Sequence, residues 1–447
     1  MIYQRLARDV LLPLLDLCGS THVAEYWKIL ERTQWLKREK IADLQQERMR
    51  RLLKHAYENV PYYHKVFRER GLTPSDIRTV EDLKKLPILR KAHIRSTPQE
   101  LTSRNLSRRE IIPCQTSGTT ATPMKFYKTK EDISWGTAAW LRAHRWGNYE
   151  LGDKLAVILA FEPPQFRNPL FRITNLFQRK YVLLNTYEAS EASIVSSAEK
   201  MENLRPWFLM GSTSIIPMLA NYLSTERRST SKLKAIFTMT DPLLASQRKL
   251  TEKVFRCEVY DCYCSSEFSL MASECGSHSG YHIQSENVVL EFVKDGDQVS
   301  PGETGTILVT SLNNYAMPFM RYDIGDMGKP SEDSCPCGRG LPLFGSLEGR
   351  TREYLLTGDG AIVYLKDLDI FFEGLPVKMF QIVQRERDEV LVRVVKADGY
   401  SEKDTNFIKR NIAWNPRKTT KVNVEIVETI PSEVSGKKRY IVNKLDE

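Results

Sequence analysis

The stretch on which the fold assignment turns is Gln115-Thr-Ser-Gly-Thr-Thr-Ala-Thr-Pro-Met124, followed directly by Lys125. It gathers five hydroxyl side chains around one glycine. Small residues let backbone N–H groups approach an anion, hydroxyls add hydrogen-bond donors, and a lysine adds positive charge. Clusters of Ser, Thr, Gly and Pro are also typical of solvated turns. The loop alone therefore leaves two interpretations open, a phosphate-binding loop or an ordinary turn.

The whole chain has the composition of an ordinary globular protein. Its 447 residues are 41% hydrophobic and 27% charged, and a chain of this length usually forms roughly two or three domains. Lys and Arg outnumber Asp and Glu by 65 to 56, and the net charge of +9 is spread along the sequence. Dispersed positive charge suits a nucleotide or another acidic ligand, whereas nucleic acid would need a concentrated basic face. We expect no nucleic-acid partner and leave the oligomeric state open.

The cysteines and the N-terminus bear on cellular location. Eight cysteines in so long a chain do not suggest a disulfide scaffold; reduced thiols or a metal site fit better and favour the cytoplasm. The segment Val10-Leu-Leu-Pro-Leu-Leu-Asp-Leu-Cys18 is apolar, but it is too short and too close to charged residues to span a membrane. We expect an amphipathic helix that packs on the body, with peripheral membrane contact as the alternative.

The order of predicted elements indicates an α/β protein. Residues 33–70 have a helical pattern that breaks at Asn59-Val-Pro-Tyr-Tyr63. From about residue 111, β-rich runs at 155–160, 234–238 and 306–310 alternate with helical stretches such as 192–204. Such alternation predicts sheets covered by helices. Beyond Gly349, short strands at 390–395 and 421–427 and a helix near 402–412 predict a small α+β module.

Four further clusters lie near the ends of predicted strands or in glycine-rich turns, where α/β proteins bind their ligands. They are Tyr260-Asp-Cys-Tyr-Cys-Ser-Ser-Glu267, Met317-Pro-Phe-Met-Arg-Tyr-Asp-Ile-Gly-Asp326, Leu347-Glu-Gly-Arg350 and Pro431-Ser-Glu-Val-Ser-Gly-Lys-Lys-Arg439. With the hydroxyl-rich loop, this set and its order resemble the adenylate-forming superfamily of acyl-CoA synthetases. The chain is most similar to the phenylacetate-CoA ligase and CapK-like branch. That similarity extends to Gln34-Trp-Leu and to His55-Ala-Tyr-Glu-Asn-Val-Pro-Tyr-Tyr63.

The resemblance implies an α/β fold with a large N-terminal adenylation body of helix-covered β-sheets and a small, mobile α+β C-terminal domain. We expect residues 1–110 to form the helical part of the large domain, 111–350 its adenylation core and 351–447 the small domain. The implied reaction is ATP-dependent activation of a carboxylic acid, with release of pyrophosphate and transfer of the acyl group to CoA. Two alternatives are transfer to an amine in surface-polysaccharide (capsule) biosynthesis and a non-catalytic nucleotide-binding scaffold.

The same resemblance implies the residues that hold the phosphates and the metal. The loop residues expected on the β- and γ-phosphates are Thr116, Ser117, Gly118, Thr119 and Thr120, with Lys125 assisting. Glu267 would ligate Mg²⁺, a hard ion that prefers oxygen donors, with Ser266 close by. Lys437, on the small domain, would neutralise charge developing on the α-phosphate. Lys437 and Glu267 are therefore the expected catalytic residues.

The remaining implied contacts concern the nucleoside. Tyr263 would stack near the adenine, Asp326 would accept hydrogen bonds from the ribose hydroxyls, and Arg350 would add a ribose or phosphate contact. The chain departs from its relatives at Gly349-Arg-Thr-Arg-Glu353, where they carry Gly-Arg-x-Asp-Asp, and at Ala121, where glycine is common. It also has Asp241-Pro242 where many relatives place a glutamate. These departures leave adenylation in place and leave the acceptor of the second step open.

A separate set of residues suggests a metal site. Cys275 and His282 precede Cys335-Pro-Cys337 in the sequence, and three thiolates with one imidazole could complete a closed, structural Zn²⁺ site of the Cys3His type. His278 competes with His282 for the fourth position. The alternative is two unrelated turns with free thiols.

Overall fold

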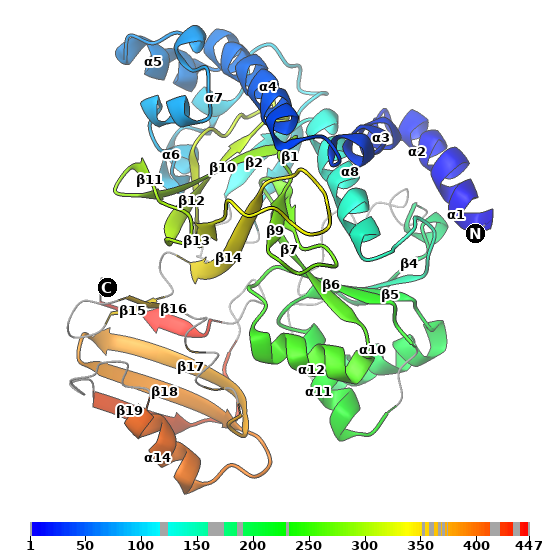
Figure 1. The fold of residues 1–447 in the computed structure, drawn as a ribbon, viewed down its shortest axis with the longest axis vertical. Coiled ribbons are helices and arrows are strands. Elements are labelled where there is room, and N and C mark those ends of the chain that lie inside the picture. The colour runs from blue at the N-terminus through cyan, green and yellow to red at the C-terminus, as the bar shows by residue number, and fades with distance from the viewer. Residues whose placement is uncertain are drawn as a thin grey trace.

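A computed structural model describes most of the chain. The described residues are 2–116, 124–159, 174–185, 191–228, 232–350, 354–356, 362–364, 368, 372, 374–411, 421–431 and 439–445. Within them, a twelve-stranded sheet forms the body, and a separate four-stranded sheet follows near the C-terminus (Figure 1). No helix in the described ranges is long and apolar enough to cross a bilayer.

The chain begins with a series of helices. They are α1 (Ile2–Leu6), a π-helical turn (Ala7–Leu11), α2 (Leu12–Gly19), α3 (Val23–Thr33), α4 (Arg38–Asn59), α5 (Pro61–Glu69), two 3-10 turns (Pro74–Asp76 and Glu81–Lys85), α6 (Lys91–Ser96) and α7 (Pro98–Leu101). The predicted break after Asn59 is confirmed. Val60 is extended, at φ −113° and ψ 110°, because a residue before proline is forced out of the helical region, while Pro61 is well suited to start the next helix.

The large sheet has a parallel and an antiparallel half that share strand β7 (Glu258–Ser265). Outward from β7, the parallel half contains β6 (Ala235–Met239), β5 (Phe208–Ser212), β3 (Leu155–Leu159) and β4 (Lys180–Asn185). In the other direction, the antiparallel half contains β8 (Ser269–Ser273), β9 (Tyr281–Ile283), β14 (Leu343–Arg350), β13 (Tyr322–Pro330), β12 (Gly305–Ser311), β10 (Val288–Lys294) and β11 (Asp297–Gln298). The three predicted β-rich runs thus form β3, β6 and β12.

The parallel half is buried on both faces. In β3, Leu155, Val157 and Leu159 pack into one hydrophobic cluster, with α3 and α8 (Lys130–Trp146). Ala156 and Ile158 point to the opposite face. There they meet α10 (Glu191–Leu204), α11 (Ile216–Thr225) and α12 (Ala245–Phe255). Successive side chains of a strand alternate between faces, so the uninterrupted apolar sequence of β3 requires helices on both sides.

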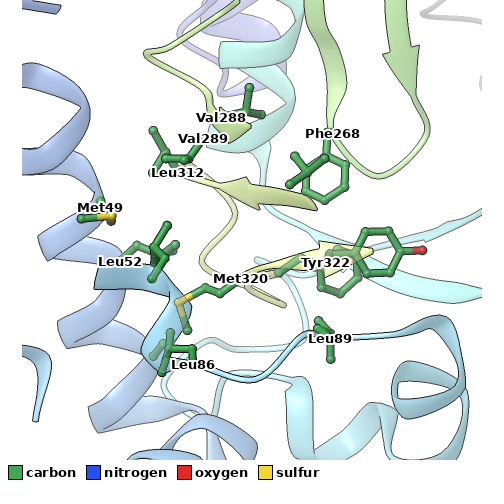
Figure 2. Packing of buried hydrophobic residues seen from close by; sticks show 14 of the residues in the cluster. Met49, Leu52, Leu86, Leu89, Phe268, Val288, Val289, Leu312, Met320 and Tyr322 are labelled. Carbon is green, nitrogen blue, oxygen red and sulfur yellow. The ribbon is translucent and has the colours of Figure 1, made fainter. Parts of the chain in front are cut away.

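The antiparallel half is joined to the N-terminal helices by the largest hydrophobic cluster. Figure 2 shows Met49 and Leu52 of α4 on the same cluster as Met320 and Leu312 from the sheet region. Tyr322, at the start of β13, is fully buried within this cluster. The packing therefore fixes the position of the Met317–Asp326 segment, which contains one of the sequence clusters.

The C-terminal part has its own sheet and core. The sheet order is β19 (Lys421–Ile426), β18 (Glu389–Lys396), β17 (Val377–Glu386) and β20 (Ile441–Asn443), and α14 (Glu402–Asn411) contacts β19. A short hairpin of β15 (Tyr354–Leu356) and β16 (Ile362–Tyr364) precedes it. Ile382, Val392 and Ile408 are fully buried in its core. The predicted fold class, an α/β body with a small α+β domain, is confirmed, while the exact domain boundaries stay predictions.

Candidate active site

The base of the hydroxyl-rich loop is closed by a two-stranded hairpin. Strands β1 (Ile112–Gln115) and β2 (Lys125–Lys128) pair antiparallel, with Gln115 opposite Lys125. The Thr116 amide donates to the Met124 carbonyl at 2.9 Å, and the Met124 amide donates to Thr116 Oγ1 at 3.0 Å. Ser117, Gly118, Thr119 and Thr120 lie outside the described residues. The hairpin therefore fixes both ends of the loop, with Lys125 exposed beside it.

Tyr322 links the loop base to Glu267. Its hydroxyl donates to Glu267 Oε1 at 3.3 Å and lies 3.9 Å from Met124 Sδ. Burial raises the pKa of Tyr322, and the neighbouring Glu267 adds to that rise, so the phenol keeps its proton for donation. Glu267 is itself buried, at 6% exposed, while Ser266 is exposed. Three sequence clusters that are far apart in the chain thus meet at one hydroxyl.

Asp326 forms the centre of a second group. The Tyr263 hydroxyl donates to Asp326 Oδ2 at 2.9 Å, and Arg350 Nε lies 3.9 Å from Asp326 Oδ1. Asp326 on β13 and Arg350 on β14 are direct partners in the sheet register. The Tyr263 ring is buried and makes an edge contact with Phe344, with ring centroids 5.9 Å apart. The residues predicted to contact the nucleoside are therefore close together, at the side of the sheet where β7 ends.

Buried and half-buried hydroxyls gather at the carboxyl ends of the parallel strands. Ser212 Oγ, at the end of β5, lies 2.8 Å from Ser214 Oγ and 3.1 Å from Thr240 Oγ1, which follows β6. Gly211 permits this close strand packing, because a Cβ there would lie 2.1 Å from the Ile158 carbonyl oxygen. Parallel sheets commonly bind ligands at this edge. The position of these hydroxyls at strand ends is a general signal for a site, and residues 211–214 are a predicted part of the acyl pocket.

The small domain contacts the body close to this edge. Gln247 Nε2, in the first turn of α12, donates to the Tyr440 hydroxyl at 2.9 Å. Leu244, which precedes α12, packs into the core cluster of the small domain. Lys437 lies outside the described residues. Tyr440, three positions further along the chain, is in contact with the body.

The four proposed metal ligands lie together. The ligand atoms of Cys275, His282, Cys335 and Cys337 are all within 4.8 Å of one another. Cys275 Sγ and Cys335 Sγ are 3.5 Å apart, and Cys337 Sγ lies 3.3 Å from His282 Nε2. Zn–S bonds of about 2.3 Å and Zn–N bonds of about 2.0–2.1 Å would place tetrahedral donor atoms roughly 3.4–3.8 Å apart. The Cys275–Cys335 pair lies within this range and the Cys337–His282 pair is about 0.1 Å shorter, so small side-chain shifts of the four ligand atoms could complete such a centre.

The surroundings of the cluster distinguish the two histidines. His282 Nδ1 lies 3.3 Å from the Leu341 carbonyl oxygen, so a proton on Nδ1 leaves Nε2 available as a ligand. His278 Nδ1 instead lies 3.3 Å from Glu274 Oε2. The geometry therefore favours His282 over His278 as the fourth ligand.

The N-terminal Gln34-Trp-Leu motif holds the second cysteine turn in place. Gln34 Oε1 accepts hydrogen bonds from Trp146 Nε1 at 2.8 Å and Arg339 Nε at 3.0 Å. The Gly340 amide donates to the Gln34 carbonyl oxygen at 2.9 Å. A Cβ on Gly340 would lie 1.8 Å from the Leu36 carbonyl oxygen, so only glycine fits there. Two motifs that are 300 residues apart therefore form one structural unit with the cluster.

Comparison with known sequences agrees with these motifs. Residues 355–444 match the family model of the CapK C-terminal domain. The phenylacetate-coenzyme A ligase of Thermus thermophilus is 26% identical over 387 residues, which cover 82% of this chain and 83% of the relative. Protein CapK of Staphylococcus aureus is 24% identical over 416 residues, covering 90% of this chain and 89% of the relative.

Solved structures show the same fold. A 2-hydroxyisobutyryl-CoA ligase in its postadenylation state, with 2-HIB-AMP bound, matches with a TM-score of 0.76 at 18% identity. The match covers 93% of this chain and 92% of the ligase. The same ligase in its thioesterification state matches with a TM-score of only 0.61, over 92% and 91% of the two chains. The chain as a whole therefore superposes better on the postadenylation structure than on the thioesterification structure.

These matches extend over both parts of the chain, and they agree with the family indicated by the five motifs. The chain is therefore similar, over most of its length, to phenylacetate-CoA ligases and to CapK, and it shares the fold of a CoA ligase that forms an acyl-adenylate.

Proposed function

We propose that the chain activates a carboxylic acid with ATP and then transfers the acyl group to CoA. The observation that carries this proposal is a pair of hydrogen bonds, Tyr322 to Glu267 and Tyr263 to Asp326, that joins two motif clusters. The base of the loop at Met124 and Arg350 of a further cluster lie beside these bonds. The predicted class of enzyme, an AMP-forming CoA ligase, is confirmed by the curated relatives. The acid itself is left to experiment.

Asp326 and Arg350 would hold the nucleoside. Asp326 Oδ2 already accepts from Tyr263, and its partly exposed carboxylate can accept further hydrogen bonds from a ribose diol. Arg350, about a third exposed, is close enough to balance the Asp326 charge and to reach a phosphate. Tyr263 fixes the carboxylate through its hydroxyl, while its predicted stacking on the adenine stays a prediction.

Glu267 and the loop would hold the phosphates. The loop from Thr116 would supply backbone and hydroxyl donors to the β- and γ-phosphates. Glu267 is a buried carboxylate beside the loop base, which is the kind of oxygen donor that Mg²⁺ prefers. A bound Mg²⁺ would offset phosphate charge during the reaction. Tyr322 holds the Glu267 side chain near Met124, at the base of the loop.

The chemistry proceeds in two displacements. A carboxylate oxygen of the acid attacks the α-phosphorus, the bond to the bridging oxygen breaks, and pyrophosphate leaves with that electron pair. Lys437 would stabilise this negative charge from the small domain. The CoA thiolate then attacks the acyl carbonyl carbon, and AMP leaves. The contact of Tyr440 with Gln247 supports the delivery of the Lys437 segment to the body in the first step.

Product analysis tests this function. Purified protein is incubated with ATP, Mg²⁺ and a panel of aryl, fatty, hydroxy and amino acids, with and without CoA. We expect AMP and pyrophosphate with at least one acid, and an acyl-CoA ester when CoA is present. Lys437→Ala should slow adenylation at least about a hundredfold, as expected for loss of one preorganised charge. Adenylate without a CoA ester would move the acceptor to an amine, and nucleotide binding without any AMP would support the scaffold alternative.

We propose, in addition, that Cys275, His282, Cys335 and Cys337 bind a structural Zn²⁺. Three thiolates and one imidazole are a common structural zinc set, and burial of three of these residues suits a closed site. Elemental analysis of protein purified without chelator should give about one zinc per chain. Cys335→Ser should lose the metal and lower the melting temperature, whereas Cys18→Ser, at an exposed cysteine, should do neither. Absence of zinc from wild-type protein would refute the site.

A further inference from the structure

The N-terminal helical segment presents apolar side chains to solvent along its whole length. Exposed hydrophobic residues recur at four- and three-residue steps on α1, the π-helical turn and α2: Ile2 (88% exposed), Leu6 (43%), Val10 (45%), Leu14 (52%) and Leu17 (78%). This spacing places them along one side of a helix. We call these five residues the outer stripe.

The outer stripe is separate from the face that packs on the body. Ala7 and Leu12 point inward and are buried with Val23 and Trp27 of α3. The prediction of a helix packed on the body is therefore correct for the inner side. The outer side is also apolar, and the packing of the described residues leaves it exposed. Two apolar sides on one surface helix indicate an external partner for the outer one.

More apolar surface lies next to the outer stripe. The Tyr3 hydroxyl donates to the Phe177 carbonyl oxygen at 2.6 Å, which brings the helical turn at 174–177 against α1. Leu176 and Phe177 in that turn are 67% and 42% exposed. Figure 1 shows α1 and α2 at the periphery of the molecule, at the opposite end from the four-stranded sheet of the small domain. A broad partner could therefore cover this region and leave the small domain free to move.

Positive charge borders the outer stripe. The segment contains Arg5 and Arg8 and two acids, Asp9 and Asp16. Asp16 faces α3, where it accepts hydrogen bonds from the Val23 and Ala24 amides. Hydrogen bonding from Arg8, together with the nearby charges of Lys28 and Arg5, lowers the pKa of Asp9. The Arg179 guanidinium lies 4.1 Å from the centroid of the Tyr3 ring. Cations around an exposed apolar strip are typical of helices that lie in the headgroup region of anionic bilayers.

We propose that this N-terminal segment binds the surface of an anionic membrane, with the outer stripe inserted among the lipids and Arg5, Lys28 and Arg179 close to the headgroups. A second copy of the chain would also bury the outer stripe. It would, however, leave the bordering cations opposite a segment whose two acids are already engaged, Asp9 with Arg8 and Asp16 with the first turn of α3. The membrane surface is the occupant that matches both the apolar and the charged features.

Vesicle flotation with the full chain tests the proposal. Vesicles of phosphatidylcholine with and without phosphatidylglycerol are used, and binding is expected to be stronger with the anionic lipid and to weaken at high salt. The double variant Leu6→Asp/Leu14→Asp should lower the partition coefficient at least about tenfold. Ile426→Asp is the matched control, because Ile426 is 42% exposed on β19 and lies outside this segment.

Thermal unfolding of each variant shows whether folding is kept. If the first double variant is unstable, a second one, Ile2→Asp/Leu17→Asp, tests the outer stripe at its two most exposed positions. This variant should also lose binding to anionic vesicles. The proposal is overturned if wild-type protein does not float with anionic vesicles or if Ile426→Asp reduces binding equally. A concentration-dependent dimer that dissociates in the Leu6→Asp/Leu14→Asp variant, without vesicle binding, would assign the outer stripe to a second copy instead.

Discussion

Replacement of Tyr322 by Phe removes a single hydroxyl from the point where the loop base meets Glu267. That hydroxyl donates to Glu267 Oε1 at 3.3 Å, while the ring packs on Phe319 with centroids 5.2 Å apart. The ring remains in Phe, so core packing should be kept. A hydrogen bond to a charged acceptor contributes about 1.5–3 kcal/mol, and the 3.3 Å length places this one near the lower value. We therefore expect about a tenfold fall in kcat/KM for ATP.

ATP–pyrophosphate exchange titrated with Mg²⁺ is the appropriate assay. If Tyr322 positions Glu267 for the metal, the Mg²⁺ concentration that gives half-maximal exchange should also rise about tenfold. A loss of about 1.5 kcal/mol in binding free energy corresponds to that factor. The matched control is Tyr63→Phe. Tyr63 is also buried in this cluster, and its hydroxyl bonds to the Pro318 carbonyl oxygen and the Met320 amide but not to Glu267. Tyr63→Phe should reduce stability and leave exchange per folded molecule unchanged. Equal Mg²⁺ dependence in wild type and Tyr322→Phe would refute the proposed role.

Two further predictions concern pH and the small domain. Burial, with the nearby charge of Glu274, raises the pKa of Asp261 from 3.8 to about 6. The folded protein therefore binds more protons between these pH values, so its free energy of unfolding should fall by about 3 kcal/mol as pH rises through them. In urea titrations, the free energy of unfolding of Asp261→Asn should not show this fall with rising pH. The same pH dependence in wild type and Asp261→Asn would contradict the prediction. Tyr440→Phe removes the contact with Gln247, so adenylation should slow about fivefold, the effect of about 1 kcal/mol, with no slower capture of preformed adenylate by CoA. Equal slowing of both half-reactions would count against a role in domain placement.

Local sequence signals predicted part of the secondary structure. Pro61 fixed the boundary between α4 and α5 through backbone sterics, and uninterrupted β-branched and aliphatic runs gave β3 and β6. The site residues were found through motif order and chain position. Asp326 and Arg350 then proved to be register partners on neighbouring strands. Such pairing follows from the sheet as a whole, which no single segment encodes.

Other features depend on contacts between distant segments. Tyr322 stood inside a recognised motif, but its bond to Glu267 spans 55 residues and has no local signal. Two histidines follow Cys275, and only the pairing of His282 with Leu343 across β9 and β14 brings that one to the cysteine turn. At the N-terminus, both sides of the helix are apolar and a π-helical turn interrupts it at Ala7–Leu11. The sequence therefore did not reveal which side faces the body.

The central claim is that the site around Glu267 and Asp326 catalyses adenylation, and ATP–pyrophosphate exchange without CoA tests it most directly. We predict acid-dependent exchange by the wild-type protein with at least one member of the acid panel. Asp326→Ala should lower it at least about tenfold, because the ribose and Arg350 both lose their carboxylate partner. Ile426→Asp, far along the sequence on an exposed strand, should exchange like wild type. Folded wild-type protein that exchanges with no acid, or exchange that Asp326→Ala leaves unchanged, would contradict the account.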